Sequence, residues 1–332
     1  MPQTLRSSRR RVESEHTTET NTLSAIQPVR FIPPQASSQA SSDQPQRKVD
    51  LIPPNLTRLP NLSTKETTFL RKKQSRLRAS ASATKTIAGD YGPHALQALS
   101  STLIFAQHEA GTAVCIHPDG WVLTCAHCFG ETEAEWQSNR RKWLLYFTGE
   151  ALQVECVAWD ARRDLALARI TALECPTLAG SDANPTPSFS FAHVALAPPS
   201  ASLKAEIICI GQPGSDDLES PTPRKTAYDL IEISQGRLRG LIPGADPHDN
   251  AEIGALRHDA WTYWGHSGAP LLRLADGVLL GLHSSWDDTT AMRHGVPLIA
   301  LRVFLRERFP GGWDEAEDQG NGEEREVIVI DD

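Results

Sequence analysis

The chain has 332 residues, a formal net charge of −8 and 39% hydrophobic residues, enough for one sizeable core with polar extensions. It contains no run of eighteen apolar residues, so no transmembrane helix and no membrane partner are expected. The N-terminus lacks the apolar segment of a secretory signal. Charge is uneven: residues 1–89 carry 15 Lys or Arg against 6 Asp or Glu, whereas residues 314–332 carry nine acids and one Arg. This asymmetry predicts a basic arm, a folded body and an acidic tail.

The first 89 residues are rich in Ser, Thr, Gln and Pro and show no hydrophobic periodicity. Residues 1–89 are therefore predicted to be a disordered basic arm. The cluster at Arg71–Arg78 is similar to a nuclear-import signal and is equally consistent with a solvated run of charges. Aromatic residues are not interleaved with these charges, so nucleic-acid binding is not expected.

Residues 90–312 are the predicted folded body. Pro93–Leu99 predicts a short helix with proline in its first turn, and Val303–Phe309 predicts a closing helix. Between them, turn residues separate short runs typical of strands, at 101–107, 143–147, 152–159, 165–170, 204–210, 228–234, 277–282 and 296–301. Many short strands and few helices predict an all-β sandwich or barrel, and the composition alone does not decide between the two.

Three segments of the body carry candidate catalytic residues. The first starts at Gly111 as an apolar strand, turns through Pro-Asp-Gly and returns as a strand that ends shortly before His127. In the second, Asp164 opens an apolar strand. In the third, Ser267 lies in the tight turn Gly-His-Ser-Gly, where two backbone N–H groups can point at one spot, as an oxyanion hole requires.

The order of these residues is informative. A serine hydroxyl becomes a nucleophile when an imidazole takes its proton, and that imidazole needs a buried carboxylate to orient it. His127, Asp164 and Ser267 follow the order of chymotrypsin-like peptidases. With the flanking pairs Gly111-Thr112 and Leu123-Thr124, the run Asp-Leu-Ala-Leu, and the closing Gly-x-Ser-Gly-x-Pro-Leu, the chain resembles the trypsin-like peptidase superfamily over about residues 95–310. It is most similar to the HtrA/DegP-like branch.

The resemblance implies two antiparallel six-stranded β-barrels of chymotrypsin type with the site in the crevice between them. His127 and Asp164 would come from the first barrel and Ser267 from the second, and the N–H groups of Gly265 and Ser267 would hold the oxyanion. The implied function is a serine endopeptidase that acts on proteins or peptides through an acyl-enzyme, without a cofactor. The alternative is a catalytically idle peptidase fold that serves as a binding protein, because a fold can outlive its chemistry.

The resemblance also sets expectations about the periphery. About twenty residues follow the closing helix, so no PDZ domain is expected. Polar segments at 214–222 and 244–250 are expected to be loops beside the cleft. The residue before the nucleophile is His266 rather than the Asp of secreted trypsins, so activation by N-terminal cleavage is not expected.

Three residues are candidates for the substrate pocket: Trp261, His283 and Ser284. Trp261 occupies the position where trypsins hold an Asp, so cleavage after Lys or Arg is not expected. His283 resembles a histidine of glutamyl endopeptidases, which implies a P1 Glu, Asp or Gln; alternatively it packs against Trp286. Ser284 matches a position whose backbone binds substrate and whose hydroxyl contacts the carboxylate of the triad.

The six cysteines do not match the disulfide frame of secreted trypsins, and without a secretory signal reduced thiols are expected. Cys125-x-x-Cys128 is compatible with metal or redox chemistry, but no second CxxC or CxxH motif accompanies it, so neither a metal site nor a redox role is expected. We expect an intracellular protein, nuclear or cytoplasmic, with mitochondria as a second choice.

The acidic tail, residues 313–332, is predicted to be disordered and ends in Val327, Ile328, Val329 and Ile330 between acidic residues. This pattern resembles a SUMO-interacting motif, which adds a strand to an exposed sheet edge. The alternative is a last edge strand of the body. SUMO or sumoylated proteins are thus the predicted partners besides substrates.

Overall fold

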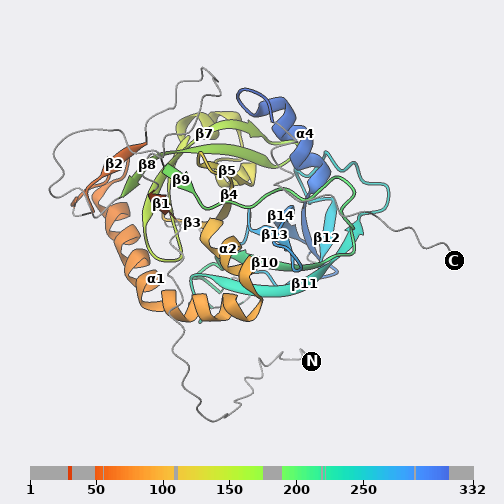
Figure 1. Cartoon of the computed structure of the whole chain (residues 1–332), viewed down its shortest axis with the longest axis horizontal. Coiled ribbons are helices and arrows are strands. Elements are labelled where there is room, and N and C mark those ends of the chain that lie inside the picture. Colours follow the sequence, from red (N-terminus) through yellow and green to blue (C-terminus); the bar gives the residue numbers. More distant parts are fainter. Residues whose placement is uncertain are drawn as a thin grey trace, which may run out of the picture.

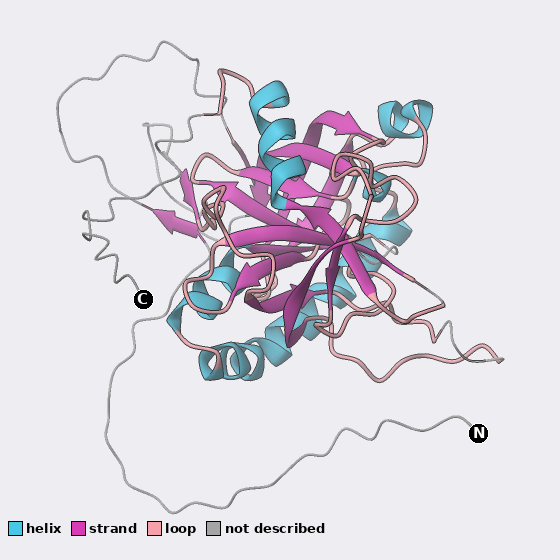
Figure 2. Cartoon of the chain, turned by 90° about the vertical axis from the view of Figure 1, so that its right-hand side faces the viewer, coloured by secondary structure: helices cyan, strands magenta, loops and turns pink. Residues whose placement is uncertain are grey.

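The computed structural model describes residues 29–31, 49–54, 56–107, 111–174, 189–217, 220, 222–287 and 289–313. Most of its strands belong to two closed antiparallel barrels that lie side by side (Figure 1). Helices lie on the outside of the strands (Figure 2). The two-barrel architecture implied by the resemblance is therefore confirmed.

The first barrel has six strands, which are β3 (Thr102–Phe105), β4 (Thr112–His117), β5 (Trp121–Thr124), β6 (Arg141–Leu145), β7 (Ala151–Asp160) and β8 (Leu165–Glu174). The pairing of β7 with β8 closes it. A further strand, β2 (Asp50–Ile52), adds to β8 in parallel. The interior is filled by alternating apolar side chains, including Leu103, Val122 and Leu144.

The second barrel is formed by β10 (Glu206–Gly211), β11 (Glu232–Leu241), β12 (Leu256–His258), β13 (Pro270–Arg273), β14 (Leu279–Trp286) and β15 (Arg293–Pro297). Helix α4 (Leu298–Arg308) follows β15 without a break and buries Leu301, Phe304 and Leu305. The closing helix thus begins earlier than the predicted 303–309. A short antiparallel pair, β1 (Val29–Phe31) with β9 (Phe189–Phe191), lies outside both barrels.

The prediction of disorder throughout residues 1–89 is wrong for its last part. Helix α1 runs over Thr64–Asp90, and α2 follows at Pro93–Ser101, where a helix was predicted. A capping box of Ser63 and Glu66 starts α1. Leu70 and Leu77, seven residues apart, are buried on one side of an otherwise polar helix. Two leucines are too few to give the hydrophobic periodicity from which a helix is predicted, so the sequence did not reveal α1.

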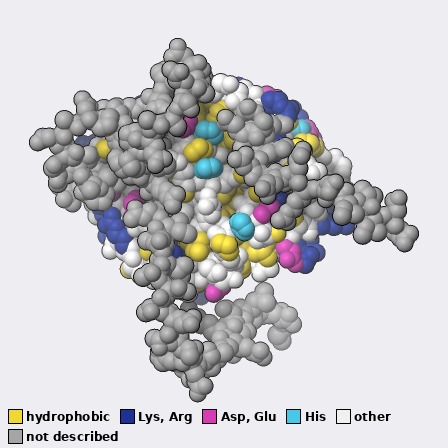
Figure 3. Space-filling model, in the orientation of Figure 1, with side chains coloured by type: hydrophobic (Ala, Val, Ile, Leu, Met, Phe, Trp, Pro, Cys, Tyr) yellow, Lys and Arg dark blue, Asp and Glu magenta, His cyan; other side chains and the backbone are white. Residues whose placement is uncertain are grey.

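The basic cluster at 71–78 forms part of the packing between α1 and the first barrel. Lys73 is buried and donates to the carbonyls of Phe105 and Gln107 at 2.7 and 2.9 Å. Arg71 forms an ion pair with Glu174 at 2.5 Å, and Glu174 is itself buried. The cluster is therefore not a wholly solvated run of charges. In the visible part of the surface, Lys and Arg side chains lie in separate small groups (Figure 3).

In the described part of the chain, no helix combines the length and apolar character that a membrane span requires. The acidic tail from residue 314 onward, with Val327, Ile328, Val329 and Ile330, lies outside the described residues. Its SUMO-interacting role stays a prediction.

Candidate active site

Three short connections bring the candidate residues together. His127 lies in the 3₁₀ turn η1 (Ala126–Cys128), directly after β5. Asp164 ends the turn between β7 and β8 in a left-handed backbone conformation, with φ of 52°. Ser267 lies between β12 and β13. The first two come from the first barrel and Ser267 from the second, as the resemblance implies.

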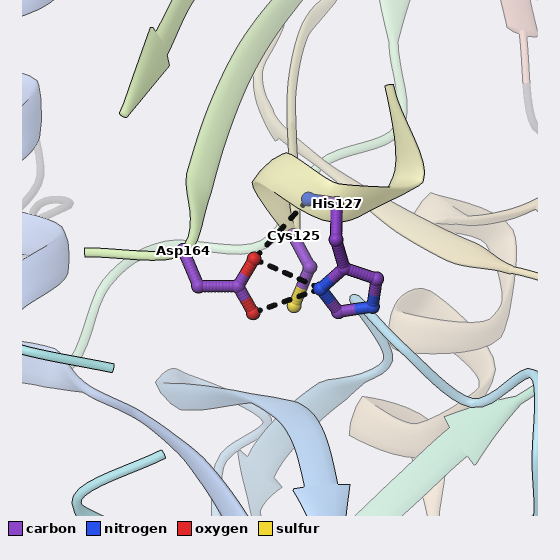
Figure 4. A group of neighbouring side chains, drawn as sticks. All are labelled: Cys125, His127 and Asp164. Carbon is purple, nitrogen blue, oxygen red and sulfur yellow. Dashed lines mark hydrogen bonds and ion pairs between the residues drawn. The ribbon is translucent and has the colours of Figure 1, made fainter. Parts of the chain in front are cut away.

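The imidazole of His127 faces the carboxylate of Asp164 (Figure 4). Its Nδ1 lies 2.9 Å from Oδ1 and 3.1 Å from Oδ2, and its backbone N–H donates to Oδ1 at 3.2 Å. A carboxylate only accepts, so Nδ1 carries the proton and Nε2 is left as the base. Ser284 Oγ donates to Oδ2 at 2.6 Å, which is the contact predicted for this residue. Asp164 is thereby buried and fully engaged.

The electrostatics of His127 follow from this pairing. Burial is the largest single influence on the pKa of His127 and lowers it, but the negative charge of Asp164 and its hydrogen bond to the ring act in the opposite direction. Glu131 adds a smaller contribution of the same sign, and the pKa of His127 is raised above its ordinary value of 6.5. The imidazole is therefore a stronger base than a solvated histidine.

The side chain of Ser267 is positioned by backbone atoms. Its Oγ donates to the carbonyl of Ser284 at 3.2 Å, and its own carbonyl accepts from Thr112 N at 2.9 Å. Among the described residues, no hydrogen bond joins Ser267 Oγ to His127. Both residues nevertheless line the same pocket.

Gly268 explains the flanking Gly-Thr and Leu-Thr pairs of the first barrel. It has a φ of 81°, and a Cβ there would lie 2.1 Å from Thr112 O and 2.2 Å from Thr124 Oγ1. Thr124 Oγ1 in turn donates to Thr112 O at 2.7 Å. The turn of the nucleophile thus lies directly on the ends of β4 and β5, and only glycine fits at this position.

The two predicted oxyanion donors, the N–H groups of Gly265 and Ser267, form no hydrogen bond within the described residues. Trp264 O accepts from Gly214 N at 2.5 Å, and Gly265 has a φ of 99°. In a trans peptide the C=O and N–H point in opposite directions, so the N–H of Gly265 faces away from the 214 loop. Within the described residues, neither Gly265 N–H nor Ser267 N–H donates to a protein acceptor.

His266, which replaces the Asp of secreted trypsins, is buried behind this turn. Its Nδ1 lies 3.0 Å from Tyr263 O and 3.1 Å from Tyr263 N. Its ring packs edge-on against Trp261, with centroids 5.5 Å apart. Burial lowers the pKa of His266 to about 4, so the ring is neutral at physiological pH. A neutral, internally bonded side chain thus occupies the place of the Asp.

Residues 111–282, just over half of the chain, match the family described as trypsin-like peptidase domain. The chain belongs to the trypsin-like peptidase family. No curated protein matches this peptidase significantly.

Among solved structures, the peptidase is similar to the inactive form of a serine mutant of Rv3671c from M. tuberculosis H37Rv, with 16% identity and a TM-score of 0.43 over 65% of this chain and 90% of that one. It is also similar to the serine endoprotease from Yersinia pestis, with 18% identity and a TM-score of 0.44 over 65% of each chain.

The peptidase has a pocket of about 310 Å³ beside the nucleophile turn. His127, Asp164, Ser267, His283 and Ser284 all line it. Six further lining residues were not predicted from the sequence. They are one threonine, three aromatic residues and two acids: Thr262, Tyr263, Trp264, Trp286, Glu131 and Glu252.

Trp261 does not line this pocket, in contrast to the prediction. Instead it stacks on Tyr263 and meets Tyr228 edge-on, with centroids 6.4 and 5.0 Å apart. The polar loops expected beside the cleft lie next to Tyr263 and the pocket wall. Asp216 and Asp217 contact the hydroxyl of Tyr263 at 3.5 Å, and the 244–250 loop leads directly into the pocket residues 251 and 252.

His283 pairs with a second buried histidine rather than with Trp286. Its Nδ1 lies 3.0 Å from His258 Nε2, and His266 lies behind it with ring centroids 6.3 Å apart. Burial lowers the pKa of His258 to about 3 and holds that of His283 well below 6.5. His258, His266 and His283 form a buried histidine cluster that is uncharged at neutral pH. His258 carries no sequence motif, so only the fold reveals it.

Cys125 Sγ, His127 Nδ1 and the Asp164 carboxylate lie within 4.8 Å of one another, a spacing that a metal ion could use (Figure 4). Two observations speak against such a site. His127 Nδ1 is already committed to Asp164. Burial raises the pKa of the Cys125 thiol well above 9, so the thiolate that a metal requires is disfavoured.

Proposed function

We propose that the protein is a serine endopeptidase in which Ser267, His127 and Asp164 hydrolyse peptide bonds through an acyl-enzyme. The observation that carries this proposal is the pairing of His127 Nδ1 with Asp164 at 2.9 Å, on the wall of the same pocket as Ser267. Membership in the trypsin-like peptidase family supports it. The likeness to the HtrA/DegP branch and the intracellular location stay predictions.

In this mechanism, Ser267 Oγ turns from the carbonyl of Ser284 toward His127 Nε2 and attacks the scissile carbonyl. His127 takes the proton as general base and returns it to the leaving amine as general acid, while Asp164 stabilises the imidazolium. The N–H groups of Gly265 and Ser267 bind the negative oxygen of the tetrahedral intermediate. Losing one such donor costs roughly 3 kcal/mol of barrier.

Labelling with a fluorophosphonate that reacts with activated serines tests the proposal. The wild-type chain is expected to be labelled at Ser267 and to hydrolyse a denatured protein substrate, and Ser267→Ala is expected to abolish both. Ser285→Ala is the matched control, because Ser285 lines the same pocket while its hydroxyl accepts from Gly254 N at 3.4 Å. A folded wild-type chain that neither labels nor hydrolyses would favour the alternative of an idle peptidase fold.

We further propose that His283 selects glutamine at P1. His258 Nδ1 has no partner among the described residues, and an unpaired lone pair costs less than an unpaired N–H. His258 therefore holds its proton on Nε2 and donates it to His283 Nδ1, which places the proton of His283 on Nε2. A neutral imidazole N–H is suited to an amide oxygen.

An ionised P1 side chain fits this pocket less well. The pKa of His283 lies well below 6.5, so no cation faces the substrate there at neutral pH. Glu131 and Glu252 line the same pocket and repel a carboxylate. Burying an uncompensated charge is more costly than burying an amide.

A peptide series that differs only at P1 tests this preference. At pH 7.5, kcat/KM is expected to be at least about tenfold higher for P1 Gln than for P1 Glu, a difference of about 1.4 kcal/mol. This difference in kcat/KM between P1 Gln and P1 Glu should narrow toward pH 5, where the glutamate side chain takes up protons. Cleavage restricted to P1 Leu or Val, or to P1 Lys, would contradict the role given to His283.

A further inference from the structure

Two cysteines bracket the proposed general base in Cys125-Ala126-His127-Cys128. Cys125 is the N-cap of η1, and Cys128 N donates to Cys125 O at 3.2 Å. Such an i to i+3 turn brings its first and last Cα atoms within about 7 Å, and a disulfide needs about 4.4–6.8 Å. The turn therefore places the two Cα atoms at a separation that a small disulfide ring can span.

The two thiols also connect the two barrels. Cys125 Sγ donates to His283 O at 3.4 Å, and Cys128 Sγ donates to Ser267 O at 3.7 Å. One cysteine thus contacts the pocket strand β14, and the other contacts the carbonyl of the proposed nucleophile. The sulfur of Cys125 lies beside both the imidazole of His127 and the carboxylate of Asp164 (Figure 4).

Access differs between the two thiols. Cys115, Cys125, Cys156 and Cys209 are buried, whereas Cys128 is partly exposed. These five cysteines of the described residues are all thiols. Of the pair, Cys128 is therefore the one that an oxidant in solution meets first, and the buried Cys125 is one helical turn away to resolve the product.

We propose that Cys125 and Cys128 are a reversible oxidation site, and that the disulfide formed there switches off the peptidase. Hydrogen peroxide oxidises the Cys128 thiol to a sulfenic acid and releases one water. The sulfur of Cys125, which burial keeps as a thiol, then attacks the sulfenic sulfur and forms the S–S bond, and its proton leaves with the sulfenic hydroxyl as a second water. In total, two thiols and one peroxide give one disulfide and two waters, and a dithiol reductant reverses the reaction.

The consequence for activity follows from the geometry of the turn. The two sulfurs must approach to about 2.05 Å, so both leave the carbonyls to which they now donate. The turn that must adjust contains His127, whose backbone N–H and Nδ1 both bond to Asp164. A shift of about 1 Å in a catalytic group can cost a hundredfold in rate. Activity is therefore expected to fall at least tenfold.

The inference rests on the proposed peptidase function, so the experiment reads the chemistry and the activity separately. The purified full chain is treated with hydrogen peroxide, quenched with catalase and divided. One part is analysed for disulfide-linked peptides by mass spectrometry, and the other is assayed for hydrolysis before and after dithiothreitol. A Cys125–Cys128 disulfide, a tenfold or greater loss of kcat and full recovery on reduction are expected.

Two variants sharpen the test. Cys128→Ser keeps a donor for Ser267 O, so it is expected to retain activity within about twofold and to resist peroxide. Cys115→Ser, a buried cysteine on β4, is expected to remain as sensitive as the wild type. The inference is overturned if the disulfide is not found, if the oxidised chain is fully active, or if Cys128→Ser loses activity equally. If the reduced chain hydrolyses nothing, the peptidase proposal fails, while the disulfide map still decides the oxidation site.

Discussion

Acidification should destabilise this protein through its buried histidine cluster. In the unfolded chain, an imidazole takes up a proton near pH 6.5. In the folded chain, the pKa of His258 is about 3 and that of His266 about 4. The unfolded state therefore binds more protons between these limits, so stability that is present above pH 6.5 is lost as the pH falls.

The size of the effect follows from these values. At pH 5, each of the two histidines lowers the free energy of unfolding by about 2 kcal/mol, or about 4 kcal/mol together. His283 acts in the same direction, and His127, whose pKa is raised, offsets part of the loss. Because whole domains are stable by only about 5–15 kcal/mol, the expected loss is a large share of the total.

Urea unfolding followed by tryptophan fluorescence at pH 7.5, 6 and 5 measures this loss. His258→Asn keeps a donor for His283 Nδ1 without a group that titrates, and it is expected to remove about 2 kcal/mol of the pH dependence. A stability that is constant within about 1 kcal/mol between pH 7.5 and 5 would refute the reasoning.

Three further predictions concern the nucleophile turn, the base and helix α1. Gly268→Ala should lower the free energy of unfolding by several kcal/mol and the activity at least a hundredfold. Gly240 has the same φ of 81° but open space around it, so Gly240→Ala should lower the free energy of unfolding by only about 1 kcal/mol, as measured by denaturation. Glu131→Gln removes a negative charge near the imidazole and should shift the acidic limb of the pH–kcat/KM profile to lower pH; an unchanged limb would deny the coupling. Arg71→Met removes the ion-pair partner of the buried Glu174 carboxylate and should lower the free energy of unfolding in urea by about 2–3 kcal/mol. The exposed Arg76→Met should lower it by under about 0.5 kcal/mol. Equal effects of the two substitutions would contradict the packing of α1.

Composition left sandwich or barrel undecided, and the family resemblance that the short motifs carry is what implied the two barrels and the convergence of His127, Asp164 and Ser267 on one pocket. Each of these residues lies at a strand end or in a tight turn, where a few neighbouring residues determine the local backbone. Ser284 was predictable for the same reason, because it lies next to His283 on the strand that faces the carboxylate.

Other parts of the structure depend on contacts between distant segments and could not be read from local patterns. Helix α1 is mostly polar, and one of the contacts that hold it is an ion pair between the partly exposed Arg71 and the buried Glu174, about a hundred residues away in the sequence. Trp261 was assigned to the pocket by its spacing from the serine, but it packs instead against Tyr228, which precedes β11, and Tyr263, which follows β12. The partner of His283 lies on β12, and the cross-strand arrangement alone brings His258 to it.

The close approach of Gly268 to β4 and β5 has a consequence for how substrates enter. The serine turn of one barrel is seated on the backbone of the other, with Thr112 N bonded to Ser267 O. A hinge motion that separated the barrels would break these contacts and would also move the nucleophile away from its base. The described surface segments beside the pocket, 214–217, 222–226 and 244–252, can vary without touching this contact, so exchanging them is the route to altering what the enzyme accepts without rebuilding its chemistry.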